Sequence, residues 1–297
     1  MTKRLVVANQ KGGVAKTTTA VNLAASLGRF GKKVLLIDLD PQANATSGIG
    51  IDKSKVGKSI YDVLIGQGDT EAVILETPAR NVHLIPANLP LVGAEIELVH
   101  APRREFRLAD SIIKNDSINQ YDFIIIDTPP SLGLLTINAL TAAQSVLIPM
   151  QCEYYALEGL AQLYQTIQLV RQKSNPNLSI EGLVFSMVDM RANLTVQVMD
   201  EVKKILKDKV YETVIPRNVR LAEAPSFGKP IADYDKHSRG AEAYERLAKE
   251  FLARHNVSPS PVQRMGEGSD EGTYSALTPD PLPPSTGEGD KKEVTIQ

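Results

Sequence analysis

Ala8–Thr19 carries the sequence A-N-Q-K-G-G-V-A-K-T-T-T, and this stretch decides the fold. It follows a short apolar run, Leu5–Ala8, that predicts a buried strand, and it precedes Thr18–Leu27, which predicts a helix. Two glycines, two lysines and a run of hydroxyls between a strand and a helix are typical of a phosphate-binding loop. Backbone N–H groups can turn toward an anion there, and the start of the helix adds partial positive charge.

Within this loop, Lys16 is expected to reach the outer phosphates and Thr17 to ligate Mg²⁺. The strict pattern G-x-x-x-x-G-K-[ST] nevertheless fails, because Gln10 and Ala15 occupy the two conserved glycine positions of that pattern. The residues expected to surround a bound nucleotide are Lys11, Gly12, Gly13, Val14, Ala15, Lys16, Thr17 and Thr18.

Composition limits the classes of protein. The chain has 297 residues, 42% of them hydrophobic, which suffices for one large domain or two small ones. Cys152, the single cysteine, excludes an intrachain disulfide framework and a cysteine-rich metal or iron–sulfur site. The N-terminus lacks the form of a signal peptide, and no apolar run approaches membrane-spanning length, so a soluble cytoplasmic protein is expected.

The formal net charge of −2 hides an asymmetry, because seven acids and three bases fall after Asn256. The remaining residues carry too little net positive charge to indicate nucleic-acid binding by charge alone. Proline, serine, glycine and acids dominate the last stretch, so we expect a folded domain over residues 1–256 and a disordered acidic tail over 257–297. The tail is either an inert extension or a segment that binds a partner or another copy of the chain.

Apolar runs alternate with segments of helical periodicity along the chain. This alternation predicts an α/β fold, a mostly parallel twisted sheet with helices on both faces. The expected strands are Leu5–Ala8, Lys33–Leu39, Val82–Pro86, Phe123–Asp127, Ser145–Pro149, Ile180–Met187 and Val210–Ile215. The expected helices are Ala20–Phe30, Leu91–Val99, Leu134–Leu140, Ala156–Gln172, Leu194–Leu206 and Ala241–Arg254.

Acidic residues end two of the expected strands. Asp38 and Asp40 lie in L-L-I-D-L-D-P-Q, where a catalytic acid would be needed; Asp40 is the candidate for orienting the attacking water, and Asp38 lies nearer the metal. The alternative is that both acids cap the following turn. Asp127 ends F-I-I-I-D, the form of a strand whose carboxylate holds Mg²⁺, and Thr128–Pro130 form a stiff exit that could sense the γ-phosphate.

Pro216 and Asn218, in I-P-R-N-V-R-L-A-E-A-P-S-F-G-K-P, are candidates for contacts to a purine edge, with a simple turn as the alternative. Basic residues gather in the same half of the chain, and they could equally form an ordinary solvated face. They are Arg191, Arg217, Arg220, Lys229, Lys236 and Arg239.

From about Lys3 to Ala253 the chain resembles the ParA/Soj-type chromosome-partitioning ATPases, which belong to the ParA/MinD class with a deviant Walker A motif. The resemblance rests on N-Q-K-G-G-V-A-K-T-T-T-A-V-N-L-A, L-L-I-D-L-D-P-Q-A-N-A-T-S-G, D-T-P-P-S-L-G-L-L-T-I-N-A-L, P-M-Q-C-E-Y-Y-A-L-E-G-L and the proline-containing motif above. It implies a bacterial, nucleoid-associated ATP hydrolase that uses ATP, ADP and Mg²⁺. It also implies an ATP-sandwich homodimer that binds double-stranded DNA non-specifically and is stimulated by a ParB-type partner.

The same resemblance assigns roles to single residues. Lys11 of one subunit contacts the nucleotide of the other, Lys16 binds phosphates and Asp40 is the hydrolytic acid. Thr17 and Asp127 serve the magnesium ion. Pro216 and Asn218 match the base contacts, and Arg191 and Arg220 match two DNA-binding arginines. Ala15 departs from the family's usual glycine, and we expect helical φ and ψ angles there, which alanine accepts.

Other functions of this fold fit the sequence less well. A MinD-like membrane-cycling ATPase would need a basic amphipathic helix at its C-terminus, whereas this chain ends D-K-K-E-V-T-I-Q after an acidic, proline-rich stretch. A nitrogenase-iron-protein-like reductase needs paired cysteines, and a tyrosine autokinase needs a tail rich in tyrosine; neither is present. A regulatory module that binds the nucleotide without hydrolysing it would not need Lys16, Asp40 and Asp127 together.

Overall fold

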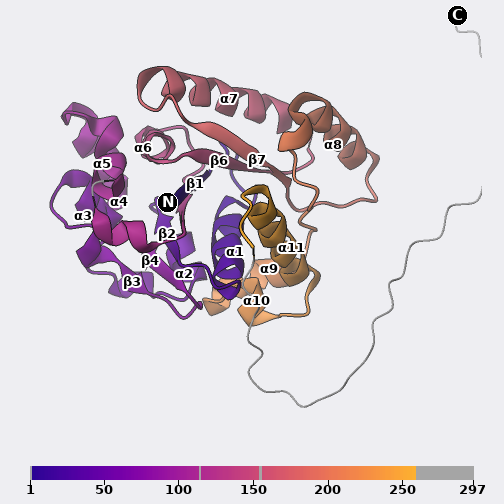
Figure 1. Ribbon diagram of the computed structural model, residues 1–297, viewed down its shortest axis with the longest axis horizontal. Helices are drawn as coiled ribbons and strands as arrows, with labels where there is room; N and C mark the ends of the chain where they lie inside the picture. The colour runs from indigo at the N-terminus through magenta and orange to yellow at the C-terminus, as the bar shows by residue number, and fades with distance from the viewer. Residues whose placement is uncertain (1, 114, 154–155, 259–297) are drawn as a thin grey trace, which may run out of the picture. The chain divides into compact units, whose positions relative to one another are not determined.

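Figure 1 shows a computed structural model of the chain, which describes residues 2–113, 115–153 and 156–258. The chain divides into a compact unit, Met1–Val262, and a second unit, Gln263–Gln297, that lies outside the described residues. The tail predicted for 257–297 therefore also lies outside them from residue 259 onward, and it stays a prediction. Among the described helices, none is long and apolar enough to cross a membrane.

A seven-stranded sheet forms the centre of the first unit, in the order β3-β4-β2-β5-β1-β6-β7. All neighbouring strands are parallel except β3 and β4, which are antiparallel. The predicted α/β class with a mostly parallel sheet is confirmed. The strands are β1 (Lys3–Val7), β2 (Val34–Asp38), β3 (Leu75–Glu76), β4 (Val82–Ile85), β5 (Phe123–Asp127), β6 (Ser145–Met150) and β7 (Ser179–Phe185).

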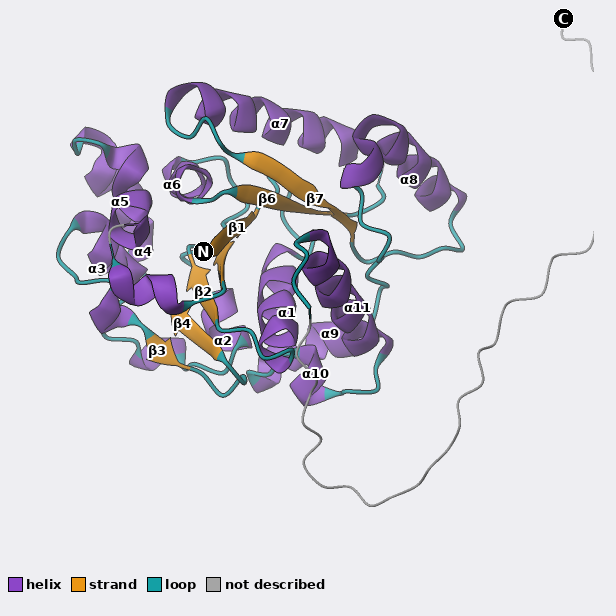
Figure 2. Cartoon of the chain, in the orientation of Figure 1, coloured by secondary structure: helices purple, strands orange, loops and turns teal. Residues whose placement is uncertain are grey.

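Helices cover both faces of this sheet (Figure 2). Because successive side chains of a strand point to opposite faces, Val6 packs into one core and Leu5 and Val7 into the other. One face carries α3 (Ile60–Ile65), α4 (Leu91–Glu97), α5 (Arg107–Ile113), α6 (Leu134–Ala142), α7 (Ala156–Lys173) and α8 (Asn193–Leu206). The other carries α1 (Lys16–Arg29), α2 (Asn44–Gly48), α9 (Val219–Glu223), α10 (Ile231–Tyr234) and α11 (Arg239–Arg254).

The strand predicted at Val210–Ile215 is wrong. The backbone there follows β7 with hydrogen bonds from Tyr211 N to Leu183 O and from Ile215 N to Phe185 O, and forms only isolated bridges. Between these two bonds, the N–H groups of Glu212 and Thr213 donate to the carboxylate of Glu250 in α11, at 2.9 Å each. These two N–H groups therefore bind a side chain rather than β7, and the parallel hydrogen-bond ladder with β7 is interrupted.

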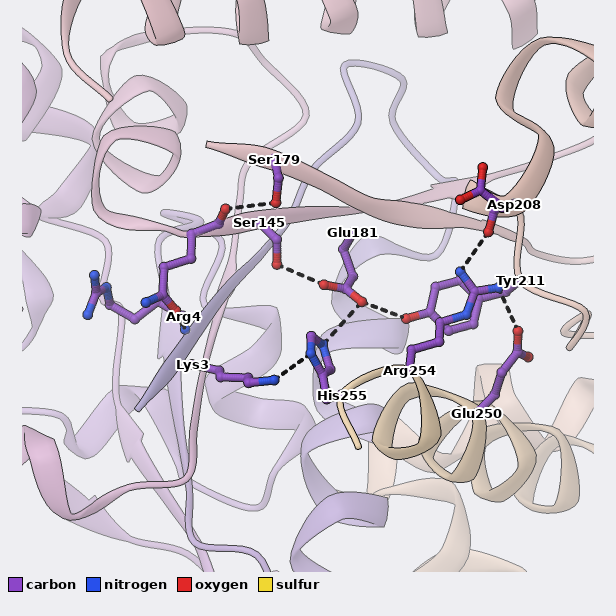
Figure 3. Close-up of polar contacts among 11 residues, drawn as sticks. Lys3, Arg4, Ser145, Ser179, Glu181, Asp208, Tyr211, Glu250, Arg254 and His255 are labelled. Carbon is purple, nitrogen blue, oxygen red and sulfur yellow. Dashed lines mark hydrogen bonds and ion pairs between the residues drawn. The ribbon is translucent and has the colours of Figure 1, made fainter. Parts of the chain in front are cut away.

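A polar cluster fixes the end of α11 at the amino-terminal edge of the sheet (Figure 3). His255 accepts from Lys3 Nζ at its Nδ1 (2.6 Å) and places its Nε2 3.2 Å from Glu181 Oε1. Ser145 Oγ and Tyr211 OH also donate to Glu181. Burial alone would raise the pKa of Glu181, but these contacts, with His255 foremost, outweigh it and lower the pKa. The cluster is therefore structural and lies at the edge opposite the phosphate-binding loop.

Candidate active site

The phosphate-binding loop leaves the carboxyl end of β1, in the middle of the sheet. In register, Val7 lies beside Asp127 of β5, and Asp127 lies beside Asp38 of β2. The loop and the two strand-ending acids are therefore neighbours at one edge, where ligands bind in open α/β sheets. The sequence predicted this convergence.

Side chains from neighbouring segments hold the loop in shape. Gln151 Nε2 donates to Gly13 O at 2.9 Å, and Ser186 Oγ donates to Val14 O at the same distance. Asn9, at the start of the loop, donates through Nδ2 to Pro149 O at 2.8 Å. Gln151 and Ser186 follow β6 and β7 directly, so their position after a strand was the one sequence signal that could have identified them.

Ala15 adopts the left-handed conformation, with φ 65° and ψ 32°, as the residue that caps the start of α1. The expectation of helical angles was wrong, because the helix begins one residue later, at Lys16, and the chain must turn sharply to enter it. For a residue with a Cβ this conformation costs roughly 1–2 kcal/mol. Gly13, two residues earlier, has φ 73° and adopts a similar angle without that cost.

Lys16 is buried, with 6% of its surface exposed, and its Nζ donates to Lys11 O at 3.1 Å. Burial lowers the pKa of Lys16, while the charges of Asp127 and Asp40 act in the opposite direction. A buried ammonium group between carboxylates and a backbone loop is suited to bind an anion that enters this space.

Asp38 and Asp40 both hold the turn into α2. Asp38 accepts from Asp40 N at 3.1 Å and from the N–H and hydroxyl of Thr46, each at 2.8 Å. Asp40 accepts from Gln42 N at 2.9 Å through Oδ1. Burial raises the pKa of Asp38 to about 6, although the bonds from Thr46 oppose this. The capping interpretation therefore holds for both acids, and the bond from Gln42 engages Oδ1 of Asp40 rather than Oδ2.

Asp127 differs from these two acids: among the described residues neither of its buried carboxylate oxygens has a hydrogen-bond partner of good geometry, although the Thr17 hydroxyl is near enough to oppose the rise of its pKa. Burial raises its pKa well above the ordinary value, and the charge of Asp38 raises it further. An orphaned buried carboxylate is costly unless a cation meets it. The residues present therefore fit Mg²⁺, which prefers oxygen ligands, with the Thr17 hydroxyl as the neighbouring donor oxygen.

No group of three or more acidic, histidine or cysteine side chains able to hold a metal occurs among the described residues. A magnesium ion at Asp127 would accordingly take its remaining ligands from hydroxyl, water and phosphate oxygens, which is how Mg²⁺ is usually held beside nucleotides. The metal and the nucleotide are thus expected to bind together.

Lys11, unlike Lys16, is paired with an acid outside the phosphate-binding loop. Its ammonium group forms an ion pair with Glu153 of the same chain, and both side chains are partly exposed, at 35% and 52%. The sequence did not predict Glu153. Its place after β6, in P-M-Q-C-E, resembles that of Gln151, but no pattern in the sequence pairs it with Lys11.

The candidate base contacts lie beside the end of β7. Val188 forms an isolated bridge with Pro216, two residues after Ser186 meets the phosphate-binding loop. Asn218 caps α9, accepting from Arg220 N at 2.8 Å through Oδ1, which leaves its amide nitrogen available. The turn interpretation therefore holds for Asn218 and does not exclude a base contact.

The two candidate DNA-binding arginines lie at the surface in separate ion pairs. Arg191 donates to both oxygens of Asp189, at 2.8 and 2.6 Å. Arg220 lies 2.9 Å from Glu223 and 3.6 Å from Asp235. Within the part of the chain that the structure describes, no recorded contact joins either arginine to the phosphate-binding loop.

A family model described as an AAA domain matches residues 2–180. The chain is 58% identical over 254 residues to the sporulation initiation inhibitor protein Soj of Bacillus subtilis, covering 85% of this chain and 99% of Soj. It is 51% identical over 261 residues to the chromosome partitioning protein ParA of Myxococcus xanthus, covering 88% and 91%.

Solved structures with the same fold bind nucleotide. One is a cobyrinic acid a,c-diamide synthase from Mycobacterium smegmatis with ADP and magnesium, at 37% identity and TM-score 0.74, covering 88% of this chain and 99% of that one. Another is the septum site-determining protein MinD of Pyrococcus horikoshii with Mg-ADP, at 27% identity and TM-score 0.71, covering 84% and 96%. The similarity to MinD is thus weaker than the similarity to Soj and ParA.

Proposed function

This chain belongs to the ParA/Soj family of chromosome-partitioning P-loop ATPases, and from this premise we propose that it hydrolyses ATP to ADP and phosphate to drive DNA segregation. The observation that carries the proposal is the meeting of Lys16, Asp40 and the orphaned Asp127 around one phosphate-binding loop. ATP, ADP and magnesium are the proposed ligands, since related structures are described with ADP and magnesium.

In the proposed reaction, the loop from Lys11 to Thr18 binds the phosphates, and Lys16 compensates their charge. Asp127 and Thr17 hold Mg²⁺, with Asp38 behind them fixing the turn. Bound there, the ion neutralises charge that develops on the phosphate oxygens. Asp40 orients the attacking water through Oδ2, the oxygen that does not accept from Gln42 N. Pro216 and Asn218 contact the purine.

Two copies assemble when ATP binds, and Lys11 of each reaches the nucleotide of the other. The paired chains then present two sets of Arg191 and Arg220 to the phosphate backbone of double-stranded DNA, without sequence preference. A ParB-type partner stimulates hydrolysis, which opens the dimer and releases the DNA. This cycle would take place in the bacterial cytoplasm, on the nucleoid.

Asp40→Ala tests the proposal, because losing the hydrolytic acid leaves ATP binding and dimerisation possible. The variant should stay dimeric on DNA with ATP and release phosphate at least tenfold more slowly than the parent protein in the presence of DNA. Asp69→Ala, at an exposed acid far from the loop in sequence, is the control and should keep parental turnover. Rapid turnover by Asp40→Ala would remove Asp40 from this role.

A further inference from the structure

The motif A-P-S-F-G-K-P, Ala224–Pro230, has no part in the proposed reaction. It forms the short 3₁₀ helix η7 (Ala224–Phe227) and a turn, and it joins α9, which carries Arg220, to α10. The motif contacts the end of α2, and the residue that follows it contacts α1; both helices adjoin the candidate active site.

The first contact runs to α2 through two glycines. Gly228 has φ 60° and Gly50, just after α2, has φ 99°. A Cβ added at Gly228 would lie 3.1 Å from Gly50 Cα and 3.3 Å from Ser47 O. A Cβ added at Gly50 would lie 2.9 Å from Gly228 O. The two backbones therefore touch directly, with no side chain between them to absorb a displacement.

The other end of α2 rests on the acids of the active site. Thr46, within α2, donates twice to Asp38, and Ala43 N donates to Asp40 O at 2.8 Å. A change in the position of the Asp38–Asp40 turn is thus passed to α2, and from α2 to Gly228.

The second contact runs to α1 through Asn22, a residue that is 6% exposed. Its Nδ2 donates to Thr18 O at 2.8 Å, and its Oδ1 accepts from Ile231 N, directly after the motif, at 2.7 Å. One amide side chain therefore bridges the end of the phosphate-binding loop and the end of the motif.

The two ion-pair partners of Arg220 lie on either side of the motif in the sequence. Arg220 is paired with Glu223 before the motif and with Asp235 after it. Tyr234 OH donates to Glu223 at 3.2 Å, and the Tyr234 ring lies against Phe227, with centroids 4.9 Å apart. Moving the motif therefore changes how tightly Arg220 is held.

We propose that Gly228 and Asn22 are positioning residues that transmit the nucleotide state of the phosphate-binding loop and the Asp38–Asp40 turn to Arg220. The proposal rests on the proposed function, because it concerns how ATP controls the DNA-binding arginine. In the ATP-bound protein the segment Ala224–Ile231 shifts with α1 and α2, and Arg220 exchanges its carboxylate partners for DNA phosphate.

The test compares Gly228→Ala, Asn22→Ala and the control Ser226→Ala, an exposed residue of the same motif, with the parent protein. For each, DNA affinity is measured with an ATP analogue and with ADP, along with ATP affinity and dimerisation. Hydrogen exchange of residues 219–231 is measured in both nucleotide states. Gly228→Ala forces a Cβ into a left-handed, closely packed position, and Asn22→Ala removes both bridging bonds.

We expect the ratio of DNA affinities with ATP analogue and ADP to fall at least tenfold in both variants, with ATP affinity and dimerisation within threefold of the parent. The nucleotide-dependent exchange difference in residues 219–231 should disappear as well, while Ser226→Ala behaves like the parent. If the parent shows the ratio and Asn22→Ala keeps it, the inference is overturned even if Gly228→Ala does not fold. If the parent itself binds DNA equally with both nucleotides, the proposed function fails instead.

Discussion

Lys11, in the phosphate-binding loop, and Glu153, three residues after β6, form an ion pair within one chain. In the proposed dimer the same lysine must reach the nucleotide of the other subunit. The two arrangements compete for one ammonium group. The ion pair with Glu153 stabilises the monomer, and it must break before the dimer forms. This competition would keep the signature lysine away from the monomer's own site until ATP and a second chain are present.

Glu153→Gln should therefore favour the dimer. An exposed ion pair contributes about 0.2–1 kcal/mol, so the ATP-analogue concentration at half-dimerisation should fall by a factor between about 1.4 and 5. Light scattering during an analogue titration measures this. Glu158→Gln, at an exposed acid in the first turn of α7, is the control. An unchanged midpoint for Glu153→Gln, or an equal shift in the control, would count against the competition.

Ala15→Gly should stabilise the protein without ligand. Glycine removes the cost of the left-handed conformation at this position but adds backbone entropy to the unfolded chain, so the net gain is about 1 kcal/mol. In a chain of this size that raises the melting temperature by roughly 2–4 °C. The control is Ala161→Gly, on the exposed face within α7, where glycine should lower it. A lower melting temperature for Ala15→Gly would show that Ala15 is not strained.

Asp127→Asn should stabilise the protein in the absence of metal and nucleotide, and should abolish the further stabilisation by Mg-ATP analogue. Burial holds the pKa of Asp127 well above 3.8, so the folded state retains a proton that the unfolded state releases. Relative to the variant, the free energy of unfolding of the parent protein therefore falls as pH rises from about 4 through the folded-state pKa of Asp127. The total fall is about 1.4 kcal/mol for each unit by which the folded-state pKa exceeds the unfolded-state pKa.

Melting curves of both proteins between about pH 4 and pH 8 measure this difference. The difference between the two proteins should shrink toward the acidic end, where Asp127 is protonated in the folded state and partly protonated in the unfolded state. If Asp127→Asn is less stable than the parent at neutral pH, or still gains stability from magnesium with nucleotide, Asp127 is not the orphaned metal ligand described here.

Much of the fold was predictable because it depends on periodicity. The buried parallel strands are continuous apolar runs, and β5, Phe123–Asp127, was predicted to the residue. The strand predicted at Val210–Ile215 failed because its pairing is decided by a distant side chain, Glu250. Short helices such as α3 and α5 were missed, since six or seven residues give too little periodicity to recognise.

In the candidate site too, some residues were predictable from the local sequence and others depend on tertiary packing. Positions fixed by strand ends and loop chemistry, such as Lys16 and Asp127, were found from local sequence. The conformation of Ala15 was not, because the left-handed turn follows from where α1 begins and from side chains that hold the loop. The Lys11–Glu153 pair was also missed, because it joins residues 142 positions apart through the packing of β1 beside β6.

Control of non-specific DNA binding by ATP is tested by measuring DNA affinity under three nucleotide conditions and at two salt concentrations. Arg220→Glu is the variant, and Arg246→Glu, at an exposed arginine of α11, is the matched control. Dimerisation with ATP analogue is followed in parallel, since Arg220→Glu should lose DNA binding and keep the dimer.

We expect strong binding with ATP analogue near 50 mM salt, weak binding with ADP or without nucleotide, and a loss of at least tenfold in affinity near 200 mM salt, because only phosphates are contacted. Arg246→Glu should follow the parent. Equal DNA affinity with ATP analogue and ADP, or an affinity that salt leaves unchanged, would show that ATP does not control DNA binding through phosphate contacts.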